Sequence, residues 1–234
     1  MCGRYVLAQP LEEVAAYFGA TVSPALEHSY APSYNVAPTD NVIGLAVRSS
    51  GERLLRPYRW GLVPSWATNP SIGNRMFNAR AETVASRPAF RAAFHARRIA
   101  VVADGYYEWQ KGPSGRRQPY YFERADGAPL AFAGLWEPWR DPKGPEDRPW
   151  LRSCTIITAE ASSDVAAFHD RMPAILADGA LEFWLDPSED DEEGLQALLA
   201  PVQKGTLRFY PVGQKVGNVR NNDPGLLERV EAAG

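Results

Sequence analysis

The second residue of the chain is a cysteine that can do chemistry no internal cysteine can do. The sequence opens Met1, Cys2, Gly3, Arg4, and removal of Met1 would leave Cys2 with an amine and a thiol two carbons apart. An α-amino group titrates at about 7.7 to 8.0 and a lysine at about 10.4, so at neutral pH the terminal amine holds roughly several hundredfold more nucleophilic free base. Such a pair can condense with an aldehyde to an imine, which the thiol closes into a thiazolidine ring. The alternative is an ordinary cysteine in a frayed terminus.

Two ionisable residues could move protons for such a cysteine, because imine formation needs protons moved on and off the amine and the departing hydroxyl. Glu108 follows an apolar strand and a turn, in the string GYYEW, whose aromatic side chains would desolvate its carboxyl. A strand-end glutamate in solvent is the alternative. His169 stands beside Asp170 and Arg171 and just before Pro173, which places it on a loop as a candidate acid or base, or as a structural histidine.

Polar and aromatic residues elsewhere could hold a phosphorylated sugar. Asn78 lies two residues before Arg80, and on an extended segment both side chains would point the same way. The amide could then hold a sugar hydroxyl and the arginine the adjoining phosphate, unless Asn78 simply caps a helix. Trp66 and Pro38 lie in predicted loops, where rigid apolar groups can stack under bases or pack into the core.

Composition excludes several classes of protein. With 234 residues and 45% hydrophobic content, the chain can bury a substantial core. The sequence has no basic region followed by an apolar stretch and no long apolar run, so we expect no membrane span and a cytoplasmic location. Two cysteines and three histidines lack metal-ligand spacing, so we expect no metal and no cofactor. Cys154, in a β-branched run, is predicted to be buried and inert.

Basic residues gather in one part of the sequence, although the net charge is −3. Residues 75–98 hold a single acid, Glu82, and six arginines: Arg75, Arg80, Arg87, Arg91, Arg97 and Arg98. Residues 178–193 hold eight acids and no base. This asymmetry predicts an anion-facing surface and a remote acidic one, although two solvated helix faces would give the same pattern.

The spacing of apolar residues predicts an α+β fold. Helices are expected at residues 11–18, 88–98, 162–168, 180–185 and 189–199. Strands are expected at residues 42–48, 54–60, 99–103, 120–124, 130–136, 154–159 and 207–212, the first two as a hairpin. Loops are expected at residues 20–38, 111–118 and 140–149. Because helices and strands do not alternate regularly, we predict one domain, residues 1–234, around a bent, barrel-like and mainly antiparallel sheet with short peripheral helices.

Seven short motifs, taken in order along the chain, resemble the SOS response-associated peptidase (SRAP) family. They are Met1–Tyr5 (MCGRY), Asn35–Pro38 (NVAP), Trp60–Pro64 (WGLVP), Asn78–Thr83 (NARAET), Ala103–Trp109 (ADGYYEW), His169–Pro173 (HDRMP) and Val216–Val219 (VGNV). Each string alone could arise by chance. Seven in the family's order, spread over nearly the whole chain, are highly specific.

The resemblance implies an abasic-site sensor on single-stranded DNA, acting in DNA repair and the SOS response. Cys2 would form a thiazolidine with the ring-opened deoxyribose aldehyde, a covalent DNA–protein crosslink that protects the lesion. Glu108 would shuttle protons, His169 would assist ring opening of the sugar, and Asn78 would position the sugar. The peptidase name implies removal of residues before the cysteine; here a methionine aminopeptidase or the protein itself would remove Met1.

The resemblance also implies contacts to DNA. The candidates are Arg4, Pro38, Trp66, Arg80, Arg87 and Arg171. The arginines would grip phosphates, which makes binding salt-sensitive and independent of sequence. Pro38 and Trp66 would form a wedge at a junction of single strand and duplex, but Ala67 stands where some members have a second tryptophan, so the stacking surface is smaller here. We expect a monomer that joins the nucleoid during DNA damage.

Two other classes of protein remain open. An N-terminal-nucleophile amidohydrolase also begins with a catalytic cysteine and would use the terminal amine as base toward the thiol. It would hydrolyse amides without Glu108 or DNA. A non-catalytic single-stranded DNA-binding module would keep the arginines and make no use of Cys2.

Overall fold

A closed β-barrel forms the larger part of the molecule. The computed structural model describes residues 2–112, 115–145 and 147–232; Met1 and parts of two predicted loops, residues 113–114 and 146, lie outside them. The barrel strands pair in the order β5 (Arg53–Trp60), β4 (Asn41–Val47), β7 (Arg98–Ala103), β10 (Leu130–Trp139) and β11 (Leu151–Glu160). All these neighbours are antiparallel. A parallel pairing of β11 with β5 closes the ring, which removes free sheet edges.

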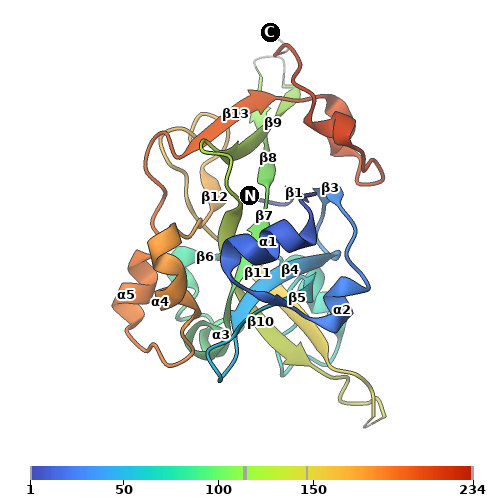
Figure 1. Cartoon of the computed structure of the whole chain (residues 1–234), viewed down its shortest axis with the longest axis vertical. Coiled ribbons are helices and arrows are strands. Elements are labelled where there is room, and N and C mark those ends of the chain that lie inside the picture. The colour runs from blue at the N-terminus through green and yellow to red at the C-terminus, as the bar shows by residue number, and fades with distance from the viewer. Residues whose placement is uncertain (1, 113–114, 146, 233–234) are drawn as a thin grey trace.

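A second, antiparallel sheet extends the barrel. Its order is β13 (Leu207–Pro211), β9 (Arg117–Arg124), β8 (Gly105–Lys111), β1 (Tyr5–Leu7) and β3 (Ser33–Val36). The chain passes from the barrel into this sheet between β7 and β8, and β13, β9 and β8 lie at the top of the view in Figure 1. The α+β class and the barrel-like, mainly antiparallel sheet are therefore confirmed.

Aromatic rings join the two sheets into a continuous core. Tyr5 on β1 lies 5.5 Å from Trp60 and 6.1 Å from Phe132, both on barrel strands, measured between ring centroids. Tyr106 on β8 stacks on Phe122 at 5.1 Å and meets Phe132 edge-on at 6.0 Å. These ring pairs bury large apolar areas at once, so the orientation of β1 and β8 relative to the barrel is fixed by packing.

The N-terminal strand is an inner strand of the second sheet, a position for which the sequence carries no signal. β1 pairs with β8 on one side and β3 on the other. Before it, the carbonyl of Arg4 accepts a hydrogen bond from the amide of Tyr107 at 3.0 Å. The Arg4 guanidinium donates to Asn35 Oδ1 at 2.8 Å and to the Val216 carbonyl at 2.7 Å. The chain therefore enters the interior at its start, and Cys2 has no exposed surface.

Short helices and single-turn segments lie around the sheets. The α-helices are α1 (Leu11–Phe18), α2 (Pro24–Glu27), α3 (Arg91–Ala96), α4 (Leu181–Leu185) and α5 (Glu192–Ala197). The 3-10 helices are η1 (Pro70–Arg75), η2 (Ala81–Thr83), η3 (Asp178–Ala180), η4 (Gln214–Gly217) and η5 (Pro224–Leu227). The remaining strands are β2 (Thr21–Val22), β6 (Asn78–Arg80) and β12 (Arg171–Pro173).

Several predicted elements need correction. Helix 11–18 and the 42–48/54–60 hairpin are confirmed, and the helix ends at Gly19 with a φ of 57°, which glycine adopts readily. The prediction of a helix at residues 162–168 is wrong, because these residues form turns. A helix this short is stable only when packing supports it. Here Phe168 packs against Phe122 and Phe209 from a turn conformation. The loop predicted at 20–38 contains α2, β2 and β3, and β8 and β9 extend into both ends of the loop predicted at 111–118.

A buried arginine fastens the peripheral helices to the barrel. Arg98, 5% exposed at the start of β7, donates to five backbone carbonyls: those of Phe94, His95, Trp184, Asp186 and Glu189. These carbonyls lie at or beyond the ends of α3 and α4, where the helix leaves acceptors without partners. One guanidinium thus satisfies the ends of both helices.

Arg98→Met should therefore destabilise the fold strongly. The five carbonyls would lose their donor, with an expected loss of about 3 kcal/mol in the free energy of unfolding and a fall of roughly 6–12 °C in Tm, measured by circular dichroism. Arg208→Met is the matched control, because Arg208 is 57% exposed and pairs with Glu123 at the surface. Equal Tm values for the two variants would contradict this role for Arg98.

Candidate active site

The backbone of Cys2 is held by the side chain of Asn78. The Asn78 amide donates from Nδ2 to the Cys2 carbonyl at 2.7 Å. Asn78 lies on β6, which runs parallel to β11 and pairs Asn78 with Ile156. Ala79 is buried and Arg80 exposed, so Asn78 and Arg80 share one side of an extended segment, as the sequence predicts. The alternative, in which Asn78 caps a helix, is wrong because the cap of η2 is Arg80.

Glu108 lies in the interior with Cys2. It is 3% exposed and belongs to the middle of β8, not to a strand end in solvent. Burial raises the pKa of the Cys2 thiol well above its usual value, and the negative charge of Glu108 raises that pKa further. At neutral pH the thiol of Cys2 is consequently protonated.

Tyr106 is a further member of this group that the sequence reasoning did not single out. It stands two residues before Glu108 on β8, on the same side of the strand. Burial raises the pKa of its phenol, and the neighbouring Cys2 and Glu108 raise it further. Tyr106 Oη and Asn78 Oδ1 are both buried and have no hydrogen-bond partner among the residues that the structure describes. Both atoms can therefore bind a polar ligand.

His169 has two partners at the same ring nitrogen. Its Nδ1 lies 2.9 Å from the backbone amide of Arg171 and 2.7 Å from Asp170 Oδ1. The amide can only donate and the carboxylate can only accept, so both contacts cannot be hydrogen bonds in one protonation state. A bare Nδ1 accepts from Arg171, and a protonated Nδ1 donates to Asp170. His169 lies on a loop, as predicted.

Arg171 binds an acid of the protein itself. Its Nη1 lies 2.5 Å from Glu82 Oε1, its Nη2 lies 3.0 Å from Glu82 Oε2, and Nη2 also donates to the Thr158 carbonyl. The side chain is 11% exposed. The hydrogen bond from Arg171 is the main cause that lowers the pKa of Glu82. This ion pair, which sequence reasoning missed, ties the segment after His169 to η2 and β11.

Asn78 also lines a groove of about 860 Å³. Four of the predicted residues line it: Trp66, Asn78, Arg80 and Arg87. Arg75, which belongs to the arginine-rich stretch of the sequence, lines it too. Trp66 is 60% exposed. Within the described part of the chain, Arg75, Arg80 and Arg87 make no ion pair with an acid. The groove therefore presents three arginines, none of them in an ion pair among the described residues, beside an exposed indole.

Three predicted DNA-contact residues, Arg4, Pro38 and Arg171, do not line this groove. Arg4 is bound to Asn35 and Val216 and lies 5.9 Å from the centre of the Trp109 ring, and burial lowers its pKa. Pro38 is half-buried, next to Thr39, whose φ is 84°.

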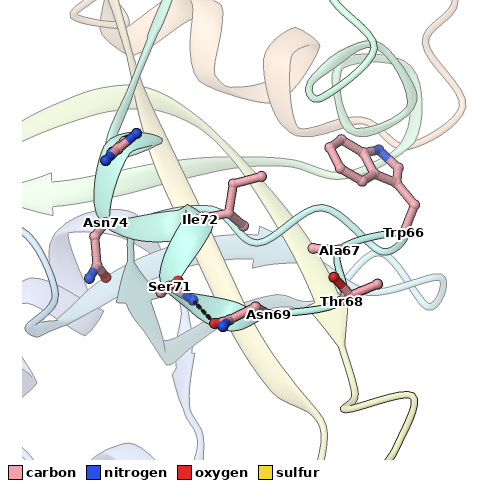
Figure 2. Close-up of a pocket in the computed structure, with 8 residues that line it drawn as sticks. Trp66, Ala67, Thr68, Asn69, Ser71, Ile72 and Asn74 are labelled. Carbon is pink, nitrogen blue, oxygen red and sulfur yellow. Dashed lines mark hydrogen bonds between the residues drawn. The ribbon is translucent and has the colours of Figure 1, made fainter.

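The loop that carries Trp66 is anchored to the barrel by a buried hydrogen bond. Ala67 is buried, and its carbonyl accepts a hydrogen bond from Trp139 Nε1 at 2.7 Å. Figure 2 shows Trp66 projecting from this loop, away from Asn69 and Asn74. Trp66 is therefore an exposed ring on a fixed base.

The structure shows no cluster of three or more His, Cys, Asp or Glu side chains with metal-binding geometry among its described residues. In the same residues, no helix combines the length and apolar character needed to cross a bilayer.

Comparison with known proteins identifies relatives over the whole chain. The model of a family described as "SOS response associated peptidase (SRAP)" matches residues 1–219. The abasic site processing protein YoqW of Bacillus subtilis is 38% identical over 97% of this chain and 99% of its own. The abasic site processing protein HMCES of Gallus gallus is 36% identical over 99% of this chain and 78% of its own. A crystal structure of a protein from Bacteroides thetaiotaomicron, 25% identical, superimposes with a TM-score of 0.87 over 98% of this chain and 100% of its own.

Replacing Glu108 with glutamine should make the Cys2 thiol easier to ionise. The charge of Glu108 contributes to the raised thiol pKa, so Glu108→Gln should shift the pH profile of Cys2 ionisation to lower pH, followed by NMR through the carbon chemical shift of Cys2 Cβ. The matched control is Glu160→Gln, an exposed residue at the end of β11. A profile of Glu108→Gln that coincides with wild type would show that no charge at Glu108 acts on the thiol.

Proposed function

Since the chain belongs to the SOS response associated peptidase (SRAP) family, we propose that it processes abasic sites in single-stranded DNA by forming a covalent crosslink through Cys2. The observation that carries the proposal is that Asn78 donates a hydrogen bond to the Cys2 carbonyl and also lines a groove that contains three arginines. A groove with free cations suits a phosphate chain, and Asn78 belongs both to that groove and to the cysteine site.

The reaction begins at the amine of Cys2, after removal of Met1 by a methionine aminopeptidase or by this site. The amine adds to the aldehyde carbon of the ring-opened deoxyribose, and the carbinolamine loses water to give an imine. The thiol then adds its sulfur to the imine carbon and its proton goes to the nitrogen, which closes a thiazolidine. No oxidant or cofactor is consumed.

The surroundings of Cys2 favour this order of steps. Burial and Glu108 raise the pKa of the thiol, so the sulfur remains protonated while the amine attacks. Glu108 serves as the proton carrier for carbinolamine dehydration. The free Asn78 Oδ1 accepts from a sugar hydroxyl, and His169 exchanges the proton that ring opening of the sugar requires.

The groove residues bind the strand on either side of the lesion. Arg80 and Arg87, with Arg75, hold phosphates, and Trp66 stacks on a base. Arg171 donates hydrogen bonds to Glu82 and to the Thr158 carbonyl. If Arg171 contacts a phosphate, its guanidinium binds that phosphate and Glu82 at the same time. Arg4 fixes β1 and acts on the site through the backbone. Pro38 contacts the DNA at the edge of a duplex in this proposal, as the family resemblance implies.

The two alternative functions explain less of the site. An amidohydrolase would need a readily ionised thiol, whereas burial and Glu108 raise the pKa of this one. A passive DNA-binding module gives no reason for a carboxyl group buried beside a thiol, an arrangement that costs stability because a buried charge loses its hydration.

Intact mass tests the crosslink directly. The protein is weighed before and after incubation with a single-stranded oligonucleotide that carries one abasic site. We expect loss of Met1 and a heat-stable adduct of protein and oligonucleotide minus one water. Glu108→Gln should slow its formation by about 100-fold, the range of a general acid–base contribution. Asn78→Ala should also slow it, because the Cys2 carbonyl loses its hydrogen-bond donor.

Cys2→Ser and Cys2→Ala separate the possible outcomes. Serine keeps the amine and should give at most a reversible imine that is lost on heating, as should alanine. A heat-stable adduct with Cys2→Ala would rule out the thiazolidine. A mature wild-type protein that forms no adduct but hydrolyses amides through Cys2 would establish the amidohydrolase instead.

The groove arginines should set the salt dependence of binding to undamaged single-stranded DNA. Arg75→Ala and Arg80→Ala should each lower the slope of log K against log salt by about 0.7, measured by fluorescence anisotropy. Arg208→Ala, on β13, is the control. If the slope were unchanged in both groove variants, DNA would not bind there.

A further inference from the structure

Three of the seven motifs meet at one buried side chain. Asn35 opens the NVAP motif, lies on β3 and is 3% exposed. It forms hydrogen bonds with Arg4, which belongs to the MCGRY motif, and with Val216, which opens the VGNV motif. The proposed function gives no task to Asn35 or to the VGNV motif. Their contacts with Arg4 connect both of them to the segment that carries Cys2.

The Asn35 amide fastens the C-terminal segment to β3. Its Nδ2 donates to the carbonyls of Val216, Asn218 and Asn221, at 3.3, 3.1 and 2.8 Å. Figure 1 shows this segment, in red, next to β3. A backbone carbonyl can only accept, so these partners fix the NH2 group on one side of the amide and Oδ1 on the other. Oδ1 is thereby directed at Arg4.

Arg4 depends on Asn35 for both hydrogen-bond acceptors of its Nη1. This nitrogen donates to Asn35 Oδ1 at 2.8 Å and to the Val216 carbonyl at 2.7 Å. The Val216 carbonyl also accepts from Asn35 Nδ2. Loss of the Asn35 side chain would therefore remove one acceptor of Arg4 and loosen the other.

The backbone of Arg4 contacts the sulfur of Cys2. Burial raises the pKa of the Cys2 thiol, and a backbone hydrogen bond from Arg4 opposes part of that rise. A backbone amide can only donate, so the N–H of Arg4 is directed at Cys2 Sγ. The Arg4 carbonyl accepts from the amide of Tyr107 at 3.0 Å. The residue that orients the sulfur is thus held by its carbonyl and by its guanidinium.

We propose that Asn35 is a positioning residue: through the Arg4 guanidinium it holds the Arg4 N–H against the Cys2 sulfur, and so aligns that sulfur for closure of the thiazolidine. The inference rests on the proposed function, because it concerns the second step of that reaction. In this step a bond forms between sulfur and the imine carbon, the π electrons of the imine move to nitrogen, and the thiol proton is transferred to the same nitrogen.

Ring closure is the step that needs this alignment. The imine carbon is attached to the Cys2 nitrogen, so the sulfur reaches it only when the Cβ–Sγ bond is turned toward that nitrogen. A hydrogen bond from the Arg4 N–H holds the sulfur in one orientation. The amine forms the imine without help from the sulfur. Loss of Asn35 should therefore slow ring closure and leave imine formation unchanged.

Two rates separate the steps in wild type and Asn35→Ala. Each protein, with Met1 removed, is mixed with a saturating single-stranded oligonucleotide that carries one abasic site. With cyanoborohydride present the imine is reduced and trapped, so the rate of total adduct measures imine formation. Without the reagent, the rate of heat-stable adduct measures ring closure. We expect Asn35→Ala to form the heat-stable adduct at least about tenfold more slowly and to match wild type in cyanoborohydride.

Two further variants isolate the contact with Arg4. Asn35→Asp keeps an oxygen for the Arg4 guanidinium and loses the donors to the three carbonyls, so it should restore most of the rate of ring closure. Asn222→Ala is the matched control, because Asn222 Oδ1 accepts from the amide of Tyr34 at 2.6 Å and fastens the same segment to β3 without Arg4. It should close the ring at the wild-type rate. Circular dichroism checks the fold of each variant.

The outcomes separate this inference from the proposed function. Ring closure at the wild-type rate in Asn35→Ala would overturn the role of Asn35 and leave the proposed function standing. Equal slowing by Asn35→Ala and Asn222→Ala would also overturn it, because attachment of the segment would then be the cause. Arg4→Met removes the same link and should give the same split between the two rates, which keeps the inference refutable if Asn35→Ala does not fold. A wild-type protein that forms no adduct under either condition would overturn both proposals.

Discussion

The site depends on the pairing of β1 between β8 and β3. Backbone hydrogen bonds fix the chain from Arg4 onward, and the Arg4 guanidinium adds Asn35 and the Val216 carbonyl to the same anchor. A terminus normally frays because few contacts oppose its conformational entropy. Here the opposite holds: Cys2 is buried because the strand that follows it is an inner strand of a sheet.

Burial of that strand brings together residues from three distant parts of the sequence. Glu108 and Tyr106 lie on β8. Asn78 lies on β6, and its side-chain amide donates a hydrogen bond to the Cys2 carbonyl. Because Cys2 and Glu108 are both buried, the charge of Glu108 acts on the thiol more strongly than it would in water. Asn78 Oδ1 and Tyr106 Oη, which have no hydrogen-bond partner among the described residues, retain their capacity to bind a ligand. The surface around β6 has the opposite character, with an exposed indole and arginines that form no ion pair within the described part of the chain. Asn78 belongs to both environments.

The ion pair of Arg171 with Glu82 shows how the barrel supports this arrangement. Glu82 follows β6 in the chain and Arg171 begins β12, and both strands flank β11. Their side chains meet across the edge of β11, and Arg171 also binds the Thr158 carbonyl of that strand. The loop of His169 and the strand of Asn78 are thus held to the same barrel strand. Closing the barrel through β5 and β11 gives these attachments a rigid base.

Residue types and their spacing were enough to predict the chemistry of the residues and much of the local structure. The amine and thiol of a cysteine at position 2, the arginine bias of residues 75–98, helix 11–18 and the 42–48/54–60 hairpin all follow from residue type and spacing, since these are local properties. The seven motifs identified the family. Tertiary structure alone decided that β1 is an inner strand, that Glu108 lies beside the thiol, that Arg171 binds Glu82 and that residues 162–168 do not form a helix. Each of these results depends on pairing or packing between residues far apart in the chain, which no local pattern encodes.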